Sequence, residues 1–140
     1  TDKYNKRFLF QNIITAESKG IELLLGGVSG FGTVVPISSN LYWVNWFWGT
    51  QFILIFETLF QRIIDYEFKK TDSADLVLSI LTRKKVILYP FISVQNEFGY
   101  SDINRLNEKP GFVKNLFVET DRRLSTIHQV NFIYNHKNVF

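Results

Sequence analysis

The feature that most constrains this chain is a run of 34 residues, Leu23 to Phe56, that contains no Asp, Glu, Lys or Arg. Charged residues make up 21% of the 140-residue chain, so they are concentrated outside this run. A helix of about 20 apolar residues can cross a bilayer. The cluster Pro36 to Asn40 lies inside the run and is rich in residues that favour turns. The pattern predicts a membrane hairpin of two transmembrane helices.

The first predicted span covers about Ala16 to Ile37, which is long enough to cross the hydrocarbon core at about 1.5 Å rise per residue. Small residues would then gather on one helix face at a spacing typical of membrane helices that pack closely. These predicted helix-packing residues are Gly26, Ser29, Gly30 and Thr33. The alternative is a glycine-rich loop inside a soluble domain.

The second predicted span covers about Tyr42 to Ile64, and its start is aromatic. All three tryptophans of the chain fall between Leu41 and Trp48. Indole and phenol rings prefer the membrane–water boundary, so we expect a membrane-interface belt here, made of Tyr42, Trp43, Trp46 and Trp48. The alternatives are an aromatic core patch or a platform for stacking carbohydrates or bases. Base-stacking platforms need interleaved cations, which this run lacks.

The end of the second span carries a candidate intramembrane polar contact, formed by Glu57, Gln61 and Arg62. An acid near the bilayer is a functional hypothesis by default. Arg62 follows Glu57 by five residues, about 7.5 Å along a helix axis, which places Glu57 near the headgroups. We therefore expect a packing or anchoring acid. A proton relay would need a second ionisable group in the spans.

Cations flank the hairpin and are absent from its turn, so the positive-inside rule places both termini on the cytoplasmic or matrix side. The expected organisation has three parts. A basic, aromatic arm covers residues 1–15, the membrane hairpin covers 16–70, and a small soluble tail, α+β or irregular, covers 71–140 and docks on partners.

Within the tail, a helix is expected to begin near the capping cluster Asp72–Asp75. A strand is expected over Val86–Val94, at a sheet edge because of Pro90. Two more strands are expected over Phe112–Val118 and Ile127–Tyr134. Three such strands make a marginal independent core, so partner surfaces are expected to complete it.

No motif in the sequence predicts an enzyme. Cysteine is absent, and His128 and His136 have no third ligand at a metal-binding spacing. No strained nucleophile turn of the Gly-x-Ser-x-Gly type occurs. The net charge of +3 is too small to indicate a nucleic-acid partner. No catalytic residue and no metal site are expected.

The composition favours residues with AT-rich codons, with 14 Phe and 6 Tyr against few alanines. This composition and the layout resemble divergent accessory subunits of mitochondrial respiratory or ATP-synthase complexes in protists. The segment Ala16 to Gly26 is also similar to the Ala-Glu-Leu-Gly-Ala-Glu-Leu-Leu-Gly run of the optic-atrophy-3 family of mitochondrial membrane proteins. Because the chain contains no methionine, Thr1 is expected to be a processed or trimmed N-terminus.

These resemblances imply a non-catalytic accessory subunit of a large energy-transducing complex in the mitochondrial inner membrane, with both termini in the matrix. Its expected partners are other subunits of that complex and membrane lipids. No cofactor is expected, and a phospholipid such as cardiolipin is a candidate bound lipid. Two alternatives stay open: a soluble α+β binding protein with a Gly- and Trp-rich core or groove, and a transport or channel component that uses Glu57.

Overall fold

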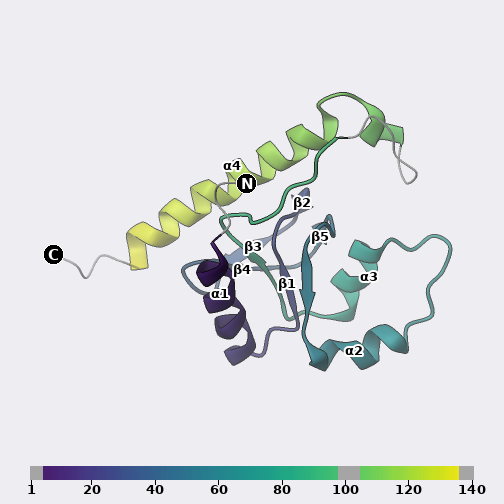
Figure 1. The fold of residues 1–140 in the computed structure, drawn as a ribbon, viewed down its shortest axis with the longest axis horizontal. Coiled ribbons are helices and arrows are strands. Elements are labelled where there is room, and N and C mark those ends of the chain that lie inside the picture. Colours follow the sequence, from purple (N-terminus) through teal and green to yellow (C-terminus); the bar gives the residue numbers. More distant parts are fainter. Residues whose placement is uncertain (1–4, 98–104, 136–140) are drawn as a thin grey trace.

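The uncharged run folds into β-strands and not into membrane helices. In a computed structural model that describes residues 5–97 and 105–135, six of the seven strands lie within this run (Figure 1). They are β1 (Leu23–Leu25), β2 (Gly30–Phe31), β3 (Val34–Pro36), β4 (Leu41–Val44), β5 (Phe47–Trp48) and β6 (Ile53–Ile55), and β7 (Lys85–Leu88) follows later. The predicted membrane hairpin with a soluble tail is therefore wrong, and the chain has an α+β fold.

Five strands form a mixed sheet in the order β3-β4-β7-β1-β6. The neighbours β1 and β7 are parallel, and the other pairs are antiparallel. Strands β2 and β5 form a separate two-stranded ribbon. The breaker cluster after Val35 does turn the chain, but it joins β3 to β4 and not two helices.

The helices are α1 (Lys6–Ser18), α2 (Glu57–Ile64), α3 (Ala74–Leu81) and α4 (Phe112–Asn135), with a 3-10 turn at Arg105–Glu108. Within the described parts of the chain, no helix combines the length and the apolar character that a bilayer crossing requires. Helices α1, α2 and α3 have 13, 8 and 8 residues. Helix α4 has 24 residues but carries charges such as Asp121 and Arg122. The predicted inner-membrane location with two spans is thereby contradicted.

The sheet is buried on both faces, and this explains the lack of charge. Alternate residues of each strand point to opposite faces. On one face, Leu24, Val86 and Leu88 pack with α1 residues such as Leu9. On the other face, Ile87 and its neighbours pack with residues of α2, α3 and α4, among them Leu59, Leu78 and Leu124. Strands covered on both faces read as continuous apolar runs, as membrane helices do.

The second half of the chain is only partly as expected. The helix predicted near Asp72–Asp75 is confirmed, since α3 begins at Ala74 with Ser73 as its N-cap residue. The strand predicted from Val86 exists as β7, but it is central, between β4 and β1. Pro90 follows β7 and so removes no hydrogen bond from the sheet. Strands from both sides of residue 70 thus share one sheet.

The two strands predicted over Phe112–Val118 and Ile127–Tyr134 are wrong, because both segments belong to α4. The buried residues of this helix recur every three or four positions, as in an amphipathic helix; they are Val113, Phe117, Thr120 and Leu124. Figure 1 shows α4 as a long helix lying across one side of the sheet, with its C-terminal end projecting from the rest of the fold.

The N-terminal arm is also helical. Residues from Lys6 onward form α1, and Asn5 caps it by accepting hydrogen bonds from the backbone N–H groups of Arg7 and Phe8. Helix α1 packs against the sheet through Leu9 and Ala16. The arm is therefore part of the folded core in its described residues, and the rest of it lies outside the described residues.

Candidate functional site

The polar contacts between α4 and the sheet begin with Tyr42 and His128. The Tyr42 ring is fully buried on β4, and its hydroxyl oxygen lies 2.7 Å from Nδ1 of His128. Burial raises the pKa of Tyr42, so its hydroxyl stays protonated at neutral pH. The hydroxyl has one hydrogen to donate and also lies 3.3 Å from the Ser39 carbonyl oxygen, so the direction of its bond with His128 depends on the imidazole tautomer. This bond fixes the orientation of His128.

A second tyrosine makes an equivalent contact. Tyr89 follows β7, and its hydroxyl donates to Oδ1 of Asp121 on α4 at 3.1 Å. Burial raises the pKa of Tyr89 too, so this hydroxyl is also a donor at neutral pH. The rings of Tyr42, Tyr89 and His128 meet edge to face, with centroids 5.5 to 6.4 Å apart. His128 lines one depression of the surface, and Tyr89 lines another.

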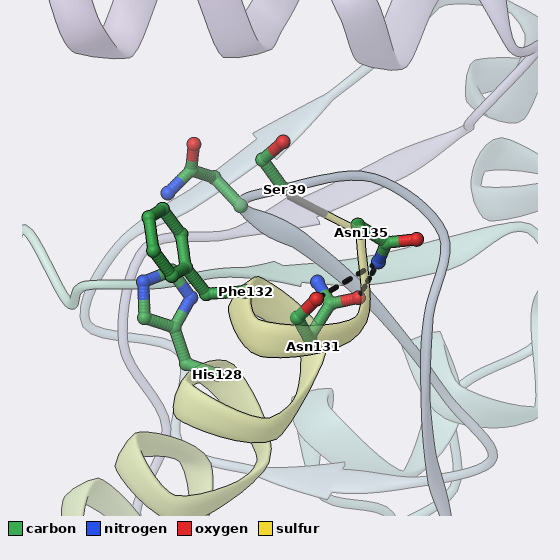
Figure 2. Close-up of a pocket in the computed structure, with 6 residues that line it drawn as sticks. Ser39, His128, Asn131, Phe132 and Asn135 are labelled. Carbon is green, nitrogen blue, oxygen red and sulfur yellow. Dashed lines mark hydrogen bonds between the residues drawn. The ribbon is translucent and has the colours of Figure 1, made fainter. Parts of the chain in front are cut away.

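The smaller depression, which we call the Asn-lined pocket, has a volume of about 200 Å³. Its walls come from α4 and from the turn before β4 (Figure 2), and its lining residues are Ser39, Asn40, His128, Asn131, Phe132 and Asn135. Most of its amides already have partners. Asn40 donates to the Tyr89 carbonyl, Asn131 donates to the Ser38 carbonyl, and Asn135 donates to Asn131. Pockets for organic ligands have volumes of roughly 300–1,000 Å³, so this one is too small for most of them.

The larger depression, which we call the β7–α4 groove, has a volume of about 840 Å³ and falls within that range. One wall is the segment that follows β7, and the other is the N-terminal half of α4. The lining residues are Tyr89, Pro90, Phe91, Val94, Gln95, Asn96, Glu97, Lys114, Phe117, Val118, Asp121 and Ser125. The groove thus begins at the carboxyl end of a parallel strand, where open α/β sheets commonly bind ligands.

Glu97 holds the two walls of the groove together. Its two carboxylate oxygens accept hydrogen bonds from the backbone N–H groups of Gly111 and Lys114, at 2.8 and 2.9 Å. These bonds, with the charge of Lys114, hold the pKa of Glu97 below its ordinary value. Because both oxygens cap the start of α4, Glu97 has a structural role.

Other polar groups of the groove keep free bonding capacity. Asp121 uses Oδ1 for Tyr89, which leaves Oδ2 as an acceptor. The Lys114 side chain forms no ion pair with any described residue. The side chains of Gln95 and Asn96 are exposed at the rim. An anion, a cation and two amides therefore face one groove with aromatic walls.

The predicted helix-packing residues lie in strands and loops that follow β1. At Gly26, an added Cβ would meet the side chains of Phe52 and Ile92 at 2.4 to 2.9 Å, so the backbone is closely covered. The Ser29 N–H donates to the Trp48 carbonyl, and Gly30 lies in β2 beneath the Trp48 ring. The Thr33 N–H donates to the Asn45 side chain. This is the glycine-rich segment of a sheet protein, the alternative left open above.

The predicted membrane-interface residues are divided between core and surface. Tyr42 is fully buried, and the half-buried Trp43 donates its indole N–H to the Arg83 carbonyl at 2.7 Å. Trp46 and Trp48 are exposed, with ring centroids 5.0 Å apart. The four aromatic residues therefore do not form one belt.

The predicted intramembrane polar residues belong to α2. Glu57 is exposed at its first residue, and Gln61 donates to Asp65 at 2.8 Å. Arg62 forms an ion pair with Glu22, with Nη2 and Oε2 2.6 Å apart. Glu22, from the first predicted span, and Arg62, from the second, are thus partners in the fold.

Sequence reasoning missed the groove residues and the tyrosine contacts. Asp121 and Ser125 are four residues apart, and Lys114 is two helical turns before Asp121, so a helical reading of residues 112–135 would have placed all three on one face. Nothing in the sequence indicates that Tyr89 faces Asp121. Within residues 5–97 and 105–135, no group of three or more His, Asp or Glu side chains is placed to hold a metal ion.

Comparison with protein-family models, with curated protein sequences and with solved structures found no match for this chain. Its function must therefore be inferred from the geometry of the α4 contacts alone.

Proposed function

We propose that this chain is a binding protein whose β7–α4 groove takes a small ligand with an anionic group at one end and a hydrogen-bond donor at the other. The observation that carries the proposal is that Lys114 and Asp121 both line one groove of about 840 Å³. The accessory-subunit hypothesis rested on two membrane spans, which the described residues do not contain. The binding-protein alternative placed its core or groove in the Gly- and Trp-rich run, whereas the β7–α4 groove lies elsewhere and its lining contains neither glycine nor tryptophan.

The spacing of the charged groups indicates the length of the ligand. Lys114 and Asp121 are seven residues apart on α4, which corresponds to about 10 Å along the helix axis. The Lys114 ammonium suits an anionic group at one end of the ligand. The free Oδ2 of Asp121 suits a hydroxyl or amino donor at the other end. A ligand that contacts both residues carries an anionic group and a hydroxyl or amino donor about 10 Å apart.

The groove walls indicate what lies between those ends. Phe91 and Pro90 line one wall, and Phe117 and Val118 line the other, so a ring can be held between apolar surfaces. The amides of Gln95 and Asn96 can pair with the edge of a heterocycle. A nucleoside monophosphate combines a phosphate, a hydroxylated sugar and a planar ring, and it matches these requirements.

Binding is favoured over catalysis because no acid–base pair converges in the groove. Both oxygens of Glu97 are bonded to the helix N-terminus. Asp121 is bonded to Tyr89, and His128 lies in the Asn-lined pocket. General acid–base catalysis needs a donor and an acceptor within hydrogen-bond reach of the same ligand atoms.

The test is to measure the thermal unfolding midpoint with adenosine, guanosine, cytidine and uridine monophosphates and with the corresponding nucleosides. A ligand at 100 times its dissociation constant stabilises the folded state by about 2.7 kcal/mol, which raises the midpoint by several degrees. At least one nucleotide is expected to do so, and its nucleoside is expected to do less.

Two groove variants and one control locate the site. Lys114→Ala is expected to remove the advantage of the nucleotide over its nucleoside, and Asp121→Asn is expected to weaken both. Lys109→Ala, which changes an exposed cation outside the groove lining, is expected to bind as the unchanged protein does. The proposal is overturned if no nucleotide stabilises the protein, or if both groove variants bind normally.

A further inference from the structure

The two outer edges of the five-stranded sheet differ. The outermost strands are β6 and β3. In β6, the pairing with β1 uses the backbone groups of Phe52, Leu54 and Phe56, which face β1. The backbone N–H and C=O groups of Ile53 and Ile55 point away from β1, and no described residue bonds to them. Four backbone groups are therefore free along this edge.

The β3 edge contains a proline, which limits pairing with another strand, whereas the β6 edge contains none. At β3, the outward-facing residues are Val34 and Pro36, and proline has no N–H to offer. Natural sheets protect open edges with short strands, proline, charged side chains or bulges. Both outer strands have three residues, but Thr50 to Phe56, which include β6 and its flanks, contain no charge and no proline. An edge without charge or proline is a template for pairing with another strand.

We infer that β6 pairs antiparallel with β6 of a second copy of this chain, so that two five-stranded sheets join into one of ten strands. Closed two-fold dimers are the commonest oligomers, and they require a surface that is complementary to itself. The β6 edge meets this requirement. A two-fold axis through Leu54 places Ile53 opposite Ile55 of the partner, and these are the residues with outward N–H and C=O groups.

The backbone geometry of this pairing is self-consistent. Each opposed pair of Ile53 and Ile55 exchanges two hydrogen bonds, so the dimer gains four. Leu54 meets its own copy at a non-hydrogen-bonded position, where Cα atoms are about 4.5 Å apart. Because Thr50 to Phe56 carry no charge, the two copies bring no like charges together at the edge. This inference is independent of the ligand proposed for the groove.

Cysteine cross-linking tests the register, because the chain contains no cysteine of its own. A Cα separation of about 4.5 Å falls within the range of roughly 4.4–6.8 Å that a disulfide spans. Under mild oxidation, Leu54→Cys is expected to form a covalent dimer in dilute solution. The control Val35→Cys, at the half-exposed β3 edge, is expected to form no disulfide-linked dimer.

Light scattering after size exclusion tests the dimer without a new cysteine. The unchanged chain is expected at twice its mass of 16.4 kDa. Ile53→Pro removes one outward N–H without breaking a bond within the monomer, and is expected to be monomeric with an unchanged circular dichroism spectrum. The matched variant Val34→Pro, which removes an outward N–H from β3, is expected to stay dimeric.

A monomeric unchanged chain at all concentrations would overturn the inference, and so would cross-linking through Val35→Cys in place of Leu54→Cys. If Ile53→Pro does not fold, the cross-linking pair alone decides. A dimer that survives Ile53→Pro and resists cross-linking at position 54 would show that another surface joins the two copies.

Discussion

Replacing Glu22 by Gln tests whether the carboxylate that precedes the uncharged run stabilises the fold. Glu22 is 6% exposed and lies just before β1. Its Oε2 accepts hydrogen bonds from Arg62 of α2 at 2.6 Å and from Thr82, which follows α3, at 2.5 Å. Its Oε1 is 3.9 Å from the Lys84 ammonium. The carboxylate therefore connects the start of β1 to two later segments, α2 and the turn between α3 and β7.

The magnitude follows from the exposure of the two partners. Removing one member of a fully buried ion pair costs about 3–5 kcal/mol. The Arg62 side chain is 45% exposed and also donates to the Leu81 carbonyl, so water can replace part of the lost interaction. Glutamine keeps one acceptor for Thr82. We expect Glu22→Gln to lower the free energy of unfolding by about 2 kcal/mol, close to the value of one hydrogen bond to a charged group.

The assay is chemical denaturation, with thermal unfolding beside it. For a chain of this length, 2 kcal/mol corresponds to a fall of roughly 6–8 °C in the unfolding midpoint. The control is Glu119→Gln, which makes the same chemical change in the exposed ion pair of Glu119 and Arg122. The control is expected to unfold as the unchanged protein does, because exposed pairs are screened by water.

The effect of pH supplies a second measurement. Burial alone would raise the pKa of Glu22, but the hydrogen bonds from Arg62 and Thr82 and the charges of Arg62 and Lys84 outweigh it, and the pKa lies below its ordinary value of 4.5. The carboxylate therefore stabilises the fold above pH 4.5, and this contribution is lost as the pH falls through the lower, folded-state pKa. A loss for Glu22→Gln no larger than that of the control, or one that does not shrink in acid, would refute the reasoning.

Three further changes probe other buried groups. Tyr42→Phe removes the hydroxyl that is hydrogen-bonded to Nδ1 of His128 and is expected to cost about 1 kcal/mol and to shift the Nδ1 signal in nitrogen NMR. Burial and the charge of Arg83 lower the pKa of Lys85. As the pH rises toward 10.5, the free energy of unfolding of the unchanged chain is therefore expected to increase relative to that of Lys85→Met, which chemical denaturation measures. Gly27→Ala places a Cβ 1.9 Å from the Ser93 carbonyl oxygen and is expected to cost about 3 kcal/mol or to prevent folding, which circular dichroism and a melting curve detect.

Much of the error in the sequence-based prediction has one physical cause. A bilayer interior and a sheet covered on both faces both exclude charge, so hydropathy cannot distinguish them. The positions of turn-favouring residues could have distinguished them. Turn-favouring residues recur every few positions between Gly26 and Gly49, a spacing that suits strands of two to four residues and not a helix of about 20.

The error over α4 has a different cause. Its aromatic and β-branched residues favour strands locally, which is why Phe112–Val118 and Ile127–Tyr134 were expected to be extended. The burial of Val113, Phe117, Thr120 and Leu124 follows a helical period, and it is the packing of this face on the sheet that stabilises the helix. Tertiary contact here overrides local propensity.

By itself, the sequence determined the features that depend on neighbouring residues: the turn after Val35 and the start of α3 after Ser73. Only the tertiary structure decided the rest. It made β7 central by pairing it with β1, about 60 residues earlier, and it brought Tyr89 to Asp121 and Tyr42 to His128. A turn or the first backbone hydrogen bond of a helix, such as that from the Val77 N–H to the Ser73 carbonyl, joins residues close in the sequence, whereas a groove or a sheet edge exists only after distant segments have packed together.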